Sequence, residues 1–274
     1  MKVLRRIFDF YLDASIHVAF AVISLIWVTR LTLNISFENH LGWFLFFSSI
    51  ACYNFIKYGV EAEKYILVVN RYHRGIQLFS FFCVPFALYH AYFLNFDTFL
   101  GIAVLLVLVA VYALPILPVS KNLRSWGGIK IFVVALVWSG TTVVLPILSS
   151  KTFFSWDAGV ETFQRFLFIL VLMVPFEIRD LAYDAPDLKT LPQRYGVTNT
   201  KILGALLTLV FFFTTFLKDE ISIGELTSKG LIFLFLGVVM YMTKRNQSKY
   251  YASFFIESIS ILWWALLGAF LQTN

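Results

Sequence analysis

Charge is scarce in this chain of 274 residues: 14 % are charged and 59 % hydrophobic, and the mean hydropathy is +0.79. A soluble domain carries roughly 25 % charged residues, so this composition excludes an ordinary soluble protein. Cysteine is also rare, and Cys52 and Cys83 both fall inside apolar stretches. They are therefore expected to be small core residues rather than a disulfide or metal pair. Flexible linkers are lacking too, which favours one membrane domain over residues 1–274.

Apolar stretches recur along the whole chain at the length that a membrane crossing requires, about 20 residues. Every backbone N–H and C=O group inside a bilayer must be paired within its own segment, so these stretches are expected to be helices rather than open strands. We therefore predict an all-α polytopic membrane protein, a bundle of about nine transmembrane helices. The predicted segments cover approximately residues 14–34, 40–57, 75–94, 98–118, 129–149, 161–178, 201–217, 229–243 and 250–271.

Lys and Arg residues are distributed unevenly over the connections between these segments. With the N-terminus inside, the inner side holds 17 of them and the outer side holds 5. Cytoplasmic loops carry the excess of Lys and Arg, so this split predicts a cytoplasmic N-terminus. An odd number of spans then places the C-terminus outside. We expect the membrane to be the cell inner membrane. The same clustering accounts for the net charge of +6, and nucleic-acid binding is not predicted.

The most informative segment, residues 177–196, begins at the end of the sixth predicted helix. Asp180 and Asp184 are four residues apart, so both carboxylates are expected to project from one face of the helix end. Pro186 favours ending the helix close to Asp184, which places Asp187 in the following turn. Carboxylates that converge in this way repel one another unless a cation joins them. Mg²⁺ is a suitable cation because it prefers one or two carboxylates together with phosphate oxygens and water.

Basic residues surround these carboxylates, and Arg179, Lys189 and Arg194 suit a ligand that bears phosphate. Lys130 opens the fifth predicted helix on the inner side, where it would face a diphosphate or simply anchor the helix. Glu257 lies inside the ninth segment, and an acid there is expected to face a cavity or to reach the membrane interface. Taken as charges alone, residues 177–196 are equally typical of a solvated loop in which Asp and Arg pair.

The complete string resembles the second aspartate-rich motif of the UbiA superfamily of intramembrane prenyltransferases. That motif reads Asp-x-x-x-Asp, often preceded by Arg, and continues with Lys-Thr-Leu-Pro and a Gly four residues after the Pro. The resemblance implies a helical bundle with a central cavity, in which Mg²⁺ bridges two aspartate-rich motifs and the diphosphate of an isoprenoid. The matching residues in this chain are Arg179, Asp180, Asp184, Lys189, Thr190, Leu191, Pro192 and Gly196.

The first motif of that family, at the end of the second helix, is only partly kept. It reads Asn-x-x-x-Asp-x-x-x-Asp, and Asn54 occupies the Asn position, but Tyr58 and Ala62 replace the two aspartates. The resemblance thus implies Asp180 and Asp184 as catalytic and metal-binding residues, with Asn54 as a third catalytic residue. Loss of the two aspartates also leaves open that catalysis has been lost.

The missing aspartates raise the question of which charge faces the diphosphate. Lys57 and Glu61 are four residues apart on the second helix and would simply pair. The alternative hypothesis is that Lys57, together with Arg71 and Arg74, supplies positive charge where the family uses a second metal ion. The predicted substrate-binding residues are therefore Lys57, Arg71, Arg74, Lys130, Arg179, Asp187, Lys189 and Arg194.

The resemblance implies transfer of a prenyl chain from an isoprenoid diphosphate to an aromatic or lipid acceptor within the bilayer. The chemistry would be ionisation of an allylic diphosphate, helped by Mg²⁺ and by basic side chains, followed by attack of the acceptor on C1. The rival interpretation is a non-catalytic isoprenoid- or quinone-binding membrane protein descended from the same family. A transporter ranks third, because no pair of helices is broken at corresponding positions in two halves.

The charge distribution makes a direct prediction about topology. A reporter fused after Asn274 is expected to lie on the periplasmic or extracellular side, and a reporter fused within residues 186–190 on the cytoplasmic side. Accessibility of the two reporters in intact cells measures this. A cytoplasmic signal from the fusion after Asn274 would rule out the predicted nine spans.

Overall fold

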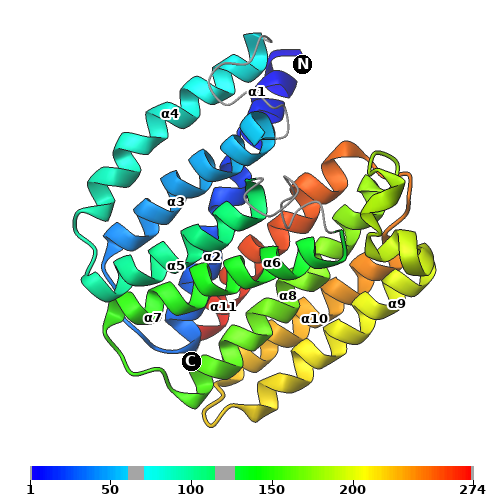
Figure 1. Cartoon of the computed structure of the whole chain (residues 1–274). Coiled ribbons are helices and arrows are strands. Elements are labelled where there is room, and N and C mark those ends of the chain that lie inside the picture. Colours follow the sequence, from blue (N-terminus) through cyan, green and yellow to red (C-terminus); the bar gives the residue numbers. More distant parts are fainter. Residues whose placement is uncertain (1, 61–70, 115–126, 273–274) are drawn as a thin grey trace.

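The computed structural model describes residues 2–60, 71–114 and 127–272, and these residues form helices and connecting turns with no β-strand (Figure 1). The fold class predicted from the sequence, all-α, is confirmed. The helices are α1 (Lys2–Asp13), α2 (Ile16–Thr32), α3 (Asn39–Asn54), α4 (Arg71–Ala91), α5 (Phe96–Ala113), α6 (Gly127–Ser139), α7 (Leu145–Ser150), α8 (Trp156–Asp180), α9 (Leu191–Phe213), α10 (Ile223–Met242) and α11 (Glu257–Gln272).

Within the described residues, each of the nine predicted segments overlaps one of these helices or a continuous helical run, and residues 115–118 of the fourth segment lie outside them. The fifth segment, for example, is α6, a π-helical turn at Gly140–Val144 and α7 in succession. Six helical runs of the described residues are long and apolar enough to cross a membrane, and the bent pair α1–α2 would add a seventh. Helices α3 and α4 are not among these runs. Helix α3 has 16 residues, and α4 starts with a polar turn. The count of nine therefore stays a prediction.

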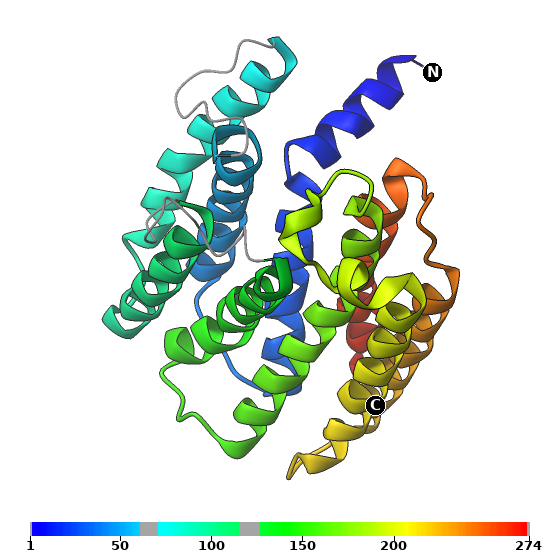
Figure 2. The same ribbon diagram turned by 45° about the vertical axis from the view of Figure 1, so that its right-hand side comes forward.

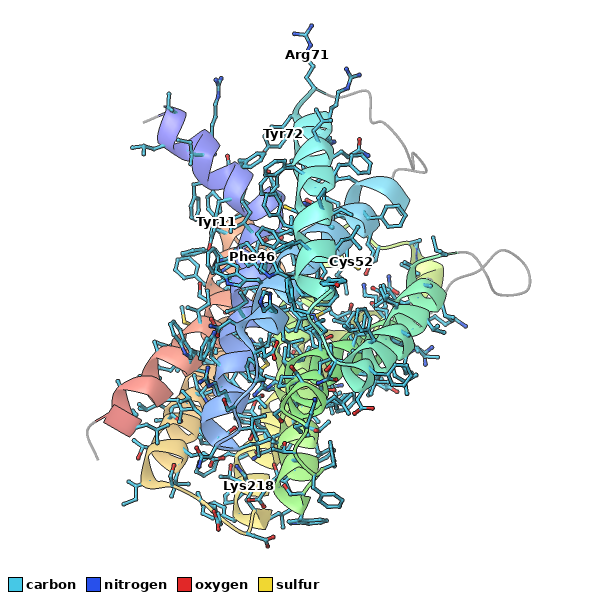
Figure 3. The ribbon with its side chains drawn as sticks, turned by 90° about the vertical axis from the view of Figure 1, so that its left-hand side faces the viewer. Tyr11, Phe46, Cys52, Arg71, Tyr72 and Lys218 are labelled. Carbon is cyan, nitrogen blue, oxygen red and sulfur yellow. The ribbon has the colours of Figure 1, made fainter. Side chains whose placement is uncertain are left out.

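The helices run broadly along one direction, with α3, α4 and α5 at one side and α9 and α10 at the other (Figures 1 and 2). The N-terminal end of the chain and the α8–α9 connection lie at one end of the bundle, and the end of α11 lies at the other. Arg71 and Lys218 mark these opposite ends in Figure 3. Termini at opposite ends are what an odd number of crossings requires.

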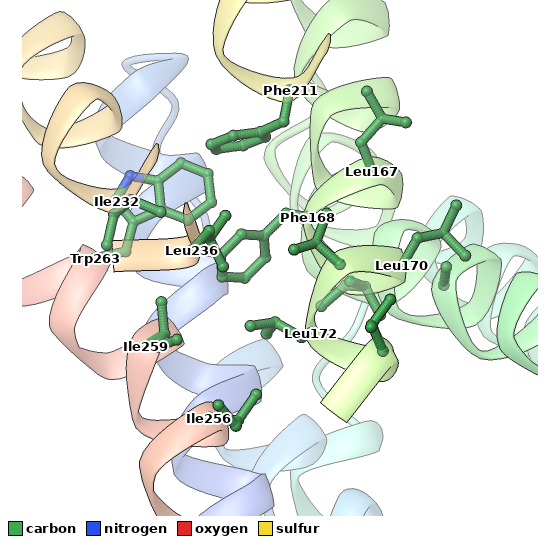
Figure 4. Close-up of a cluster of buried hydrophobic side chains, with 14 of the residues drawn as sticks. Leu167, Phe168, Leu170, Leu172, Phe211, Ile232, Leu236, Ile256, Ile259 and Trp263 are labelled. Atoms are coloured by element: carbon green, nitrogen blue, oxygen red, sulfur yellow. The ribbon is translucent and has the colours of Figure 1, made fainter. Parts of the chain in front are cut away.

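Helix α8 is the most buried of the candidate spans in the described part of the chain, and α5 is the least buried. The main core forms where α8 packs against α9, α10 and α11 (Figure 4). Phe168 of α8 and Phe211 of α9 both contact Trp263 of α11, with ring centroids 5.0 and 5.6 Å apart. Apolar packing of this kind holds helices together in a membrane, where lipid tails are as apolar as the side chains.

Five charged side chains are buried together at the end of the bundle that Lys218 marks. Lys229 Nζ lies 3.0 Å from Glu161 Oε2 and 2.7 Å from Glu225 Oε1, and Lys218 Nζ lies 2.7 Å from Glu225 Oε1. Arg165 Nη2 lies 3.0 Å from Glu161 Oε1. These side chains are at most 3 % exposed, so each charge depends on its partners rather than on water. We call this set the outer charge network, after the side on which the predicted topology places it.

Arg165 connects this network to three other parts of the bundle. Its Nη1 donates hydrogen bonds to the Leu25 carbonyl oxygen at 2.9 Å and to Thr142 Oγ1 at 3.0 Å, and its guanidinium lies 5.0 Å from the Trp263 ring centroid. Burial disfavours the charged form of Lys218, but the nearby carboxylates outweigh this and raise its pKa above the ordinary lysine value. The sequence assigned these cations to the outer side but did not predict that they pair.

Removing one carboxylate from the outer charge network is expected to destabilise the fold. Glu161→Gln leaves Arg165 without its carboxylate partner and leaves Lys218 and Lys229 to share Glu225. It should lower the free energy of unfolding by about 3–5 kcal/mol. Thermal unfolding in detergent measures this. The matched control is Glu220→Gln, an exposed carboxylate near the same end, expected to change stability by less than about 0.5 kcal/mol. Equal melting temperatures for the two variants would contradict the role of the network.

Candidate functional site

The two predicted aspartates lie at the C-terminal end of α8, which we call its inner end after the predicted topology. The helix ends at Asp180, and the backbone N–H of Asp184 donates to the Asp180 carbonyl oxygen at 2.8 Å, which adds one further turn. Pro186 then begins a short 3-10 helix, Pro186–Leu188. Arg179 Nε donates to Asp180 Oδ1 at 2.8 Å, and Arg179 Nη1 donates to Ser253 Oγ at 3.3 Å. The Asp180 carboxylate is therefore already paired with a neighbouring guanidinium.

Lys130, near the start of α6, reaches the same place from another helix. Its Nζ lies 3.4 Å from Asp184 Oδ2 and 2.8 Å from Glu177 Oε1. The side chain of Glu177 is 1 % exposed, and that of Asp184 is 17 % exposed. Lys130 thus bridges a buried carboxylate and a solvent-accessible one. Glu177 is not among the predicted site residues, although its spacing of three residues from Asp180 places it on the same side of α8.

The remaining residues of the motif build the start of α9. Thr190 is the N-cap, and its backbone N–H donates to Gln193 Oε1 at 3.0 Å. Pro192 stands in the first turn, where its missing N–H is not needed. Gly196 has φ 77°, a left-handed conformation that interrupts the helix and favours glycine. The Lys-Thr-Leu-Pro string and the following glycine therefore shape the connection behind the aspartates.

Two predicted phosphate-binding residues belong to this connection. Arg194 Nε donates to the Lys189 carbonyl oxygen at 2.7 Å, and both side chains are exposed. A Cβ built on Gly128 would lie 3.7 Å from Arg194 Nη2, so Arg194 stands close to the start of α6 and hence to Lys130. The side chain of Asp187 lies outside the described part of the structure. Their predicted contacts with a phosphate group stay predictions.

Asn54, the retained residue of the first motif, is 1 % exposed at the end of α3. Its Nδ2 donates both hydrogens, to the Ala14 carbonyl oxygen at 3.0 Å and to Ser80 Oγ at 2.9 Å, and its Oδ1 accepts from Ser15 Oγ at 2.8 Å. Ser15 has φ 58° and lies at the 55° bend between α1 and α2. These bonds favour a structural role for Asn54 in holding the bend, rather than contact with substrate.

Lys57 and Tyr58, on the π-helix Phe55–Val60 after α3, contact Asp13 at the end of α1. Lys57 Nζ lies 3.9 Å from Asp13 Oδ1, and Tyr58 Oη donates to the Asp13 carbonyl oxygen at 3.0 Å. The predicted pairing of Lys57 with Glu61 involves a residue outside the described ranges, as does the motif position of Ala62. The structure thus gives Lys57 a carboxylate partner that the sequence analysis did not consider.

Arg71 and Arg74 lie on the first turn of α4 and are exposed, and Figure 3 shows Arg71 at the extreme end of the molecule. Glu257, at the start of α11, is partly exposed. That it faces a cavity stays a prediction.

The donor atoms at the inner end of α8 fit Mg²⁺ in part. Among the described residues, no group of three or more His, Cys, Asp or Glu side chains is arranged to hold a metal ion. Asp180 and Asp184, however, present accessible carboxylates, and their side chains are 32 % and 17 % exposed. Mg²⁺ commonly takes one or two carboxylates and completes its octahedron with phosphate oxygens and water. The two aspartates therefore suit Mg²⁺ bound together with a diphosphate better than Mg²⁺ alone.

Comparison with known proteins shows the fold. No family model matches the sequence, and no curated protein matches it. A UbiA homologue from Archaeoglobus fulgidus bound to DMAPP and Mg²⁺ superposes with a TM-score of 0.58 at 15 % identity, over 96 % of this chain and 99 % of that chain. The same homologue bound to GPP and Mg²⁺ gives a TM-score of 0.59 at 15 % identity and equal coverage. A digeranylgeranylglyceryl phosphate synthase gives 0.57 at 15 % identity, over 99 % and 98 % of the two chains.

These superpositions extend over nearly the whole length of both chains. The protein is thus a polytopic helical membrane protein, and its architecture is that of the UbiA homologues. The helical bundle that the motif resemblance implied is confirmed, and its central cavity stays a prediction.

The structural role of Asn54 can be tested by removing its amide. Asn54→Ala leaves buried partners on Ser15, Ala14 and Ser80 without their bonds and should lower the free energy of unfolding by about 1–3 kcal/mol. Chemical or thermal unfolding in detergent measures this, with Asn199→Ala, an exposed position on α9, as the control. If Asn54 acts by contacting substrate instead, Asn54→Ala would keep its stability and lose isoprenoid diphosphate binding.

Proposed function

We propose that this chain is a UbiA-like membrane prenyltransferase that moves a prenyl chain from an isoprenoid diphosphate to an aromatic or other hydrophobic acceptor. The observation that carries the proposal is the cluster at the inner end of α8. Asp180 and Asp184, one helical turn apart, are accessible and are each joined to a cation, Arg179 or Lys130. This cluster occurs in a fold shared with structures that bind DMAPP or GPP with Mg²⁺.

The residues of the cluster would have different roles in binding and ionising a diphosphate. Asp180 and Asp184 would hold Mg²⁺, which neutralises charge on the diphosphate and on the leaving group as it departs. Arg179 and Lys130 stand beside these carboxylates and would stabilise the negative charge that develops on the leaving oxygen. A diphosphate carries several negative charges, and apolar surroundings make uncompensated charge expensive.

Further basic residues extend this positive surface. Lys189 and Arg194 lie between α8 and the first turns of α9, and Lys57, Arg71 and Arg74 lie at the same end of the bundle, where these cations would attract a phosphate-bearing substrate. In the reaction, the acceptor then attacks C1 of the prenyl chain, whose apolar remainder stays among the helices.

We propose further that residues 1–274 act as one domain in the cell inner membrane, with the inner end of α8 on the cytoplasmic side.

One observation favours the second candidate, a non-catalytic isoprenoid- or quinone-binding protein. Asn54 and Tyr58, at two of the three positions of the first motif, are engaged in contacts between helices. A site with one aspartate-rich motif retains half of the carboxylates that the family uses. Measuring pyrophosphate release with a mixture of phenolic and lipid acceptors separates the two candidates, because a binding protein retains diphosphate affinity and releases no pyrophosphate.

The metal-site assignment predicts the effect of neutralising each aspartate. Asp180→Asn and Asp184→Asn should each abolish the Mg²⁺-dependent thermal stabilisation by geranylgeranyl diphosphate and weaken its binding more than ten-fold, about 1.4 kcal/mol. The melting temperature without ligand should stay close to that of the parent. Asp219→Asn, an exposed acid near the opposite end, is the control. Unchanged Mg²⁺ dependence in both aspartate variants would show that the assignment is wrong.

A further inference from the structure

Lys130 occupies the position that a metal ion would compete for. Its Nζ stands between Asp184 Oδ2, at 3.4 Å, and Glu177 Oε1, at 2.8 Å, and its side chain is 13 % exposed. An ammonium group at this distance neutralises the Asp184 carboxylate in the same way that a bound cation does. Asp184 is one of the two carboxylates suited to Mg²⁺, so the two cations share one ligand.

Glu177 keeps Lys130 in this position. Its carboxylate is 1 % exposed, and neither oxygen has a well-oriented hydrogen bond to the described residues, which leaves the Lys130 ammonium as its ion-pair partner. A buried carboxylate without a counterion is strongly destabilising, so the Lys130–Glu177 contact is expected to persist when other contacts of Lys130 change. The contact between Lys130 and the more exposed Asp184 is longer, and it is the one that another cation can replace.

We propose that Lys130 is a resident counterion that competes with Mg²⁺ for Asp184 and is held within reach by Glu177. The inference rests on the proposed function, because it concerns how that site loads its ligands. Without diphosphate, Mg²⁺ must displace the Lys130 ammonium from Asp184 and then stay close to that positive charge. Metal binding without diphosphate is therefore weakened. A diphosphate supplies the negative charge that accommodates both cations, so metal and diphosphate bind together. By linkage, each ligand raises the affinity for the other by the same factor.

The competition is measured with Mn²⁺, an EPR-visible substitute for Mg²⁺, on the full-length protein in detergent without any diphosphate. Lys130→Met removes the competing charge and should tighten Mn²⁺ binding roughly five-fold or more, within the usual range of coupling between sites. Glu177→Gln frees Lys130 to pair with Asp184 alone and should weaken Mn²⁺ binding. Lys201→Met is the matched control, because its Nζ contacts the Tyr241 and Thr243 carbonyl oxygens.

Lys130→Met also leaves Glu177 without its counterion, so a second variant guards against misfolding. The double variant Lys130→Met with Glu177→Gln removes both charges and should still bind Mn²⁺ more tightly than the parent. Adding Asp184→Asn to it should abolish that gain. Parent-like or undetectable Mn²⁺ binding in the double variant would overturn the counterion role.

Binding of geranylgeranyl diphosphate to the same variants separates the two proposals. Tighter Mn²⁺ binding in the double variant, without diphosphate binding by any variant including the parent, supports the counterion role and contradicts the prenyltransferase. Diphosphate binding by the parent, together with unchanged Mn²⁺ affinity in the double variant, overturns the counterion role alone.

Discussion

Charge neutralisation along α8 is the constraint on which the rest of the structure depends. This helix carries Glu161 and Arg165 in its outer half and Glu177, Arg179 and Asp180 at its inner end. A charge in apolar surroundings is tolerated only with a partner close by, so helices that supply partners must pack against α8 in one register. Lys130 of α6 and Lys229 of α10 meet this requirement at opposite ends. The apolar contacts between these ends then complete the bundle.

The two ends of α8 differ in how fully their charges are satisfied. In the outer charge network the side chains are at most 3 % exposed, and Lys229 Nζ contacts Glu161, Glu225 and Gln164 within 3.0 Å. Each of its charged side chains has an oppositely charged partner, which suits a structural role. At the inner end, Asp180 and Asp184 are partly exposed, and the Asp184 contact with Lys130 is long. A ligand can bind such partly exposed carboxylates because they can exchange one charged partner for another.

Asn54 and Tyr58 join helices at the inner end. Tyr58 Oη donates to the Asp13 carbonyl oxygen at the end of α1, and Asn54 secures the bend at Ser15. These contacts join α1, α2 and α3 beside the site. The positive charge nearest to Asp184 comes from Lys130 on α6, whereas Lys57 lies against Asp13. The hypothesis that Lys57 replaces a metal ion is therefore less well supported than a role for Lys130.

The sequence by itself determined the helical class, the approximate positions of α2 to α11 and the segment that carries the aspartates, but it did not predict α1. These features follow from local patterns, because hydropathy, capping residues such as Thr190 and a spacing of four residues act within one or two turns of helix. Tertiary structure decided which charges meet. Lys130 and Asp184 are 54 residues apart, and Asn54 and Ser15 are 39 apart. Their contacts depend on the packing of helices distant in sequence, which no local pattern specifies.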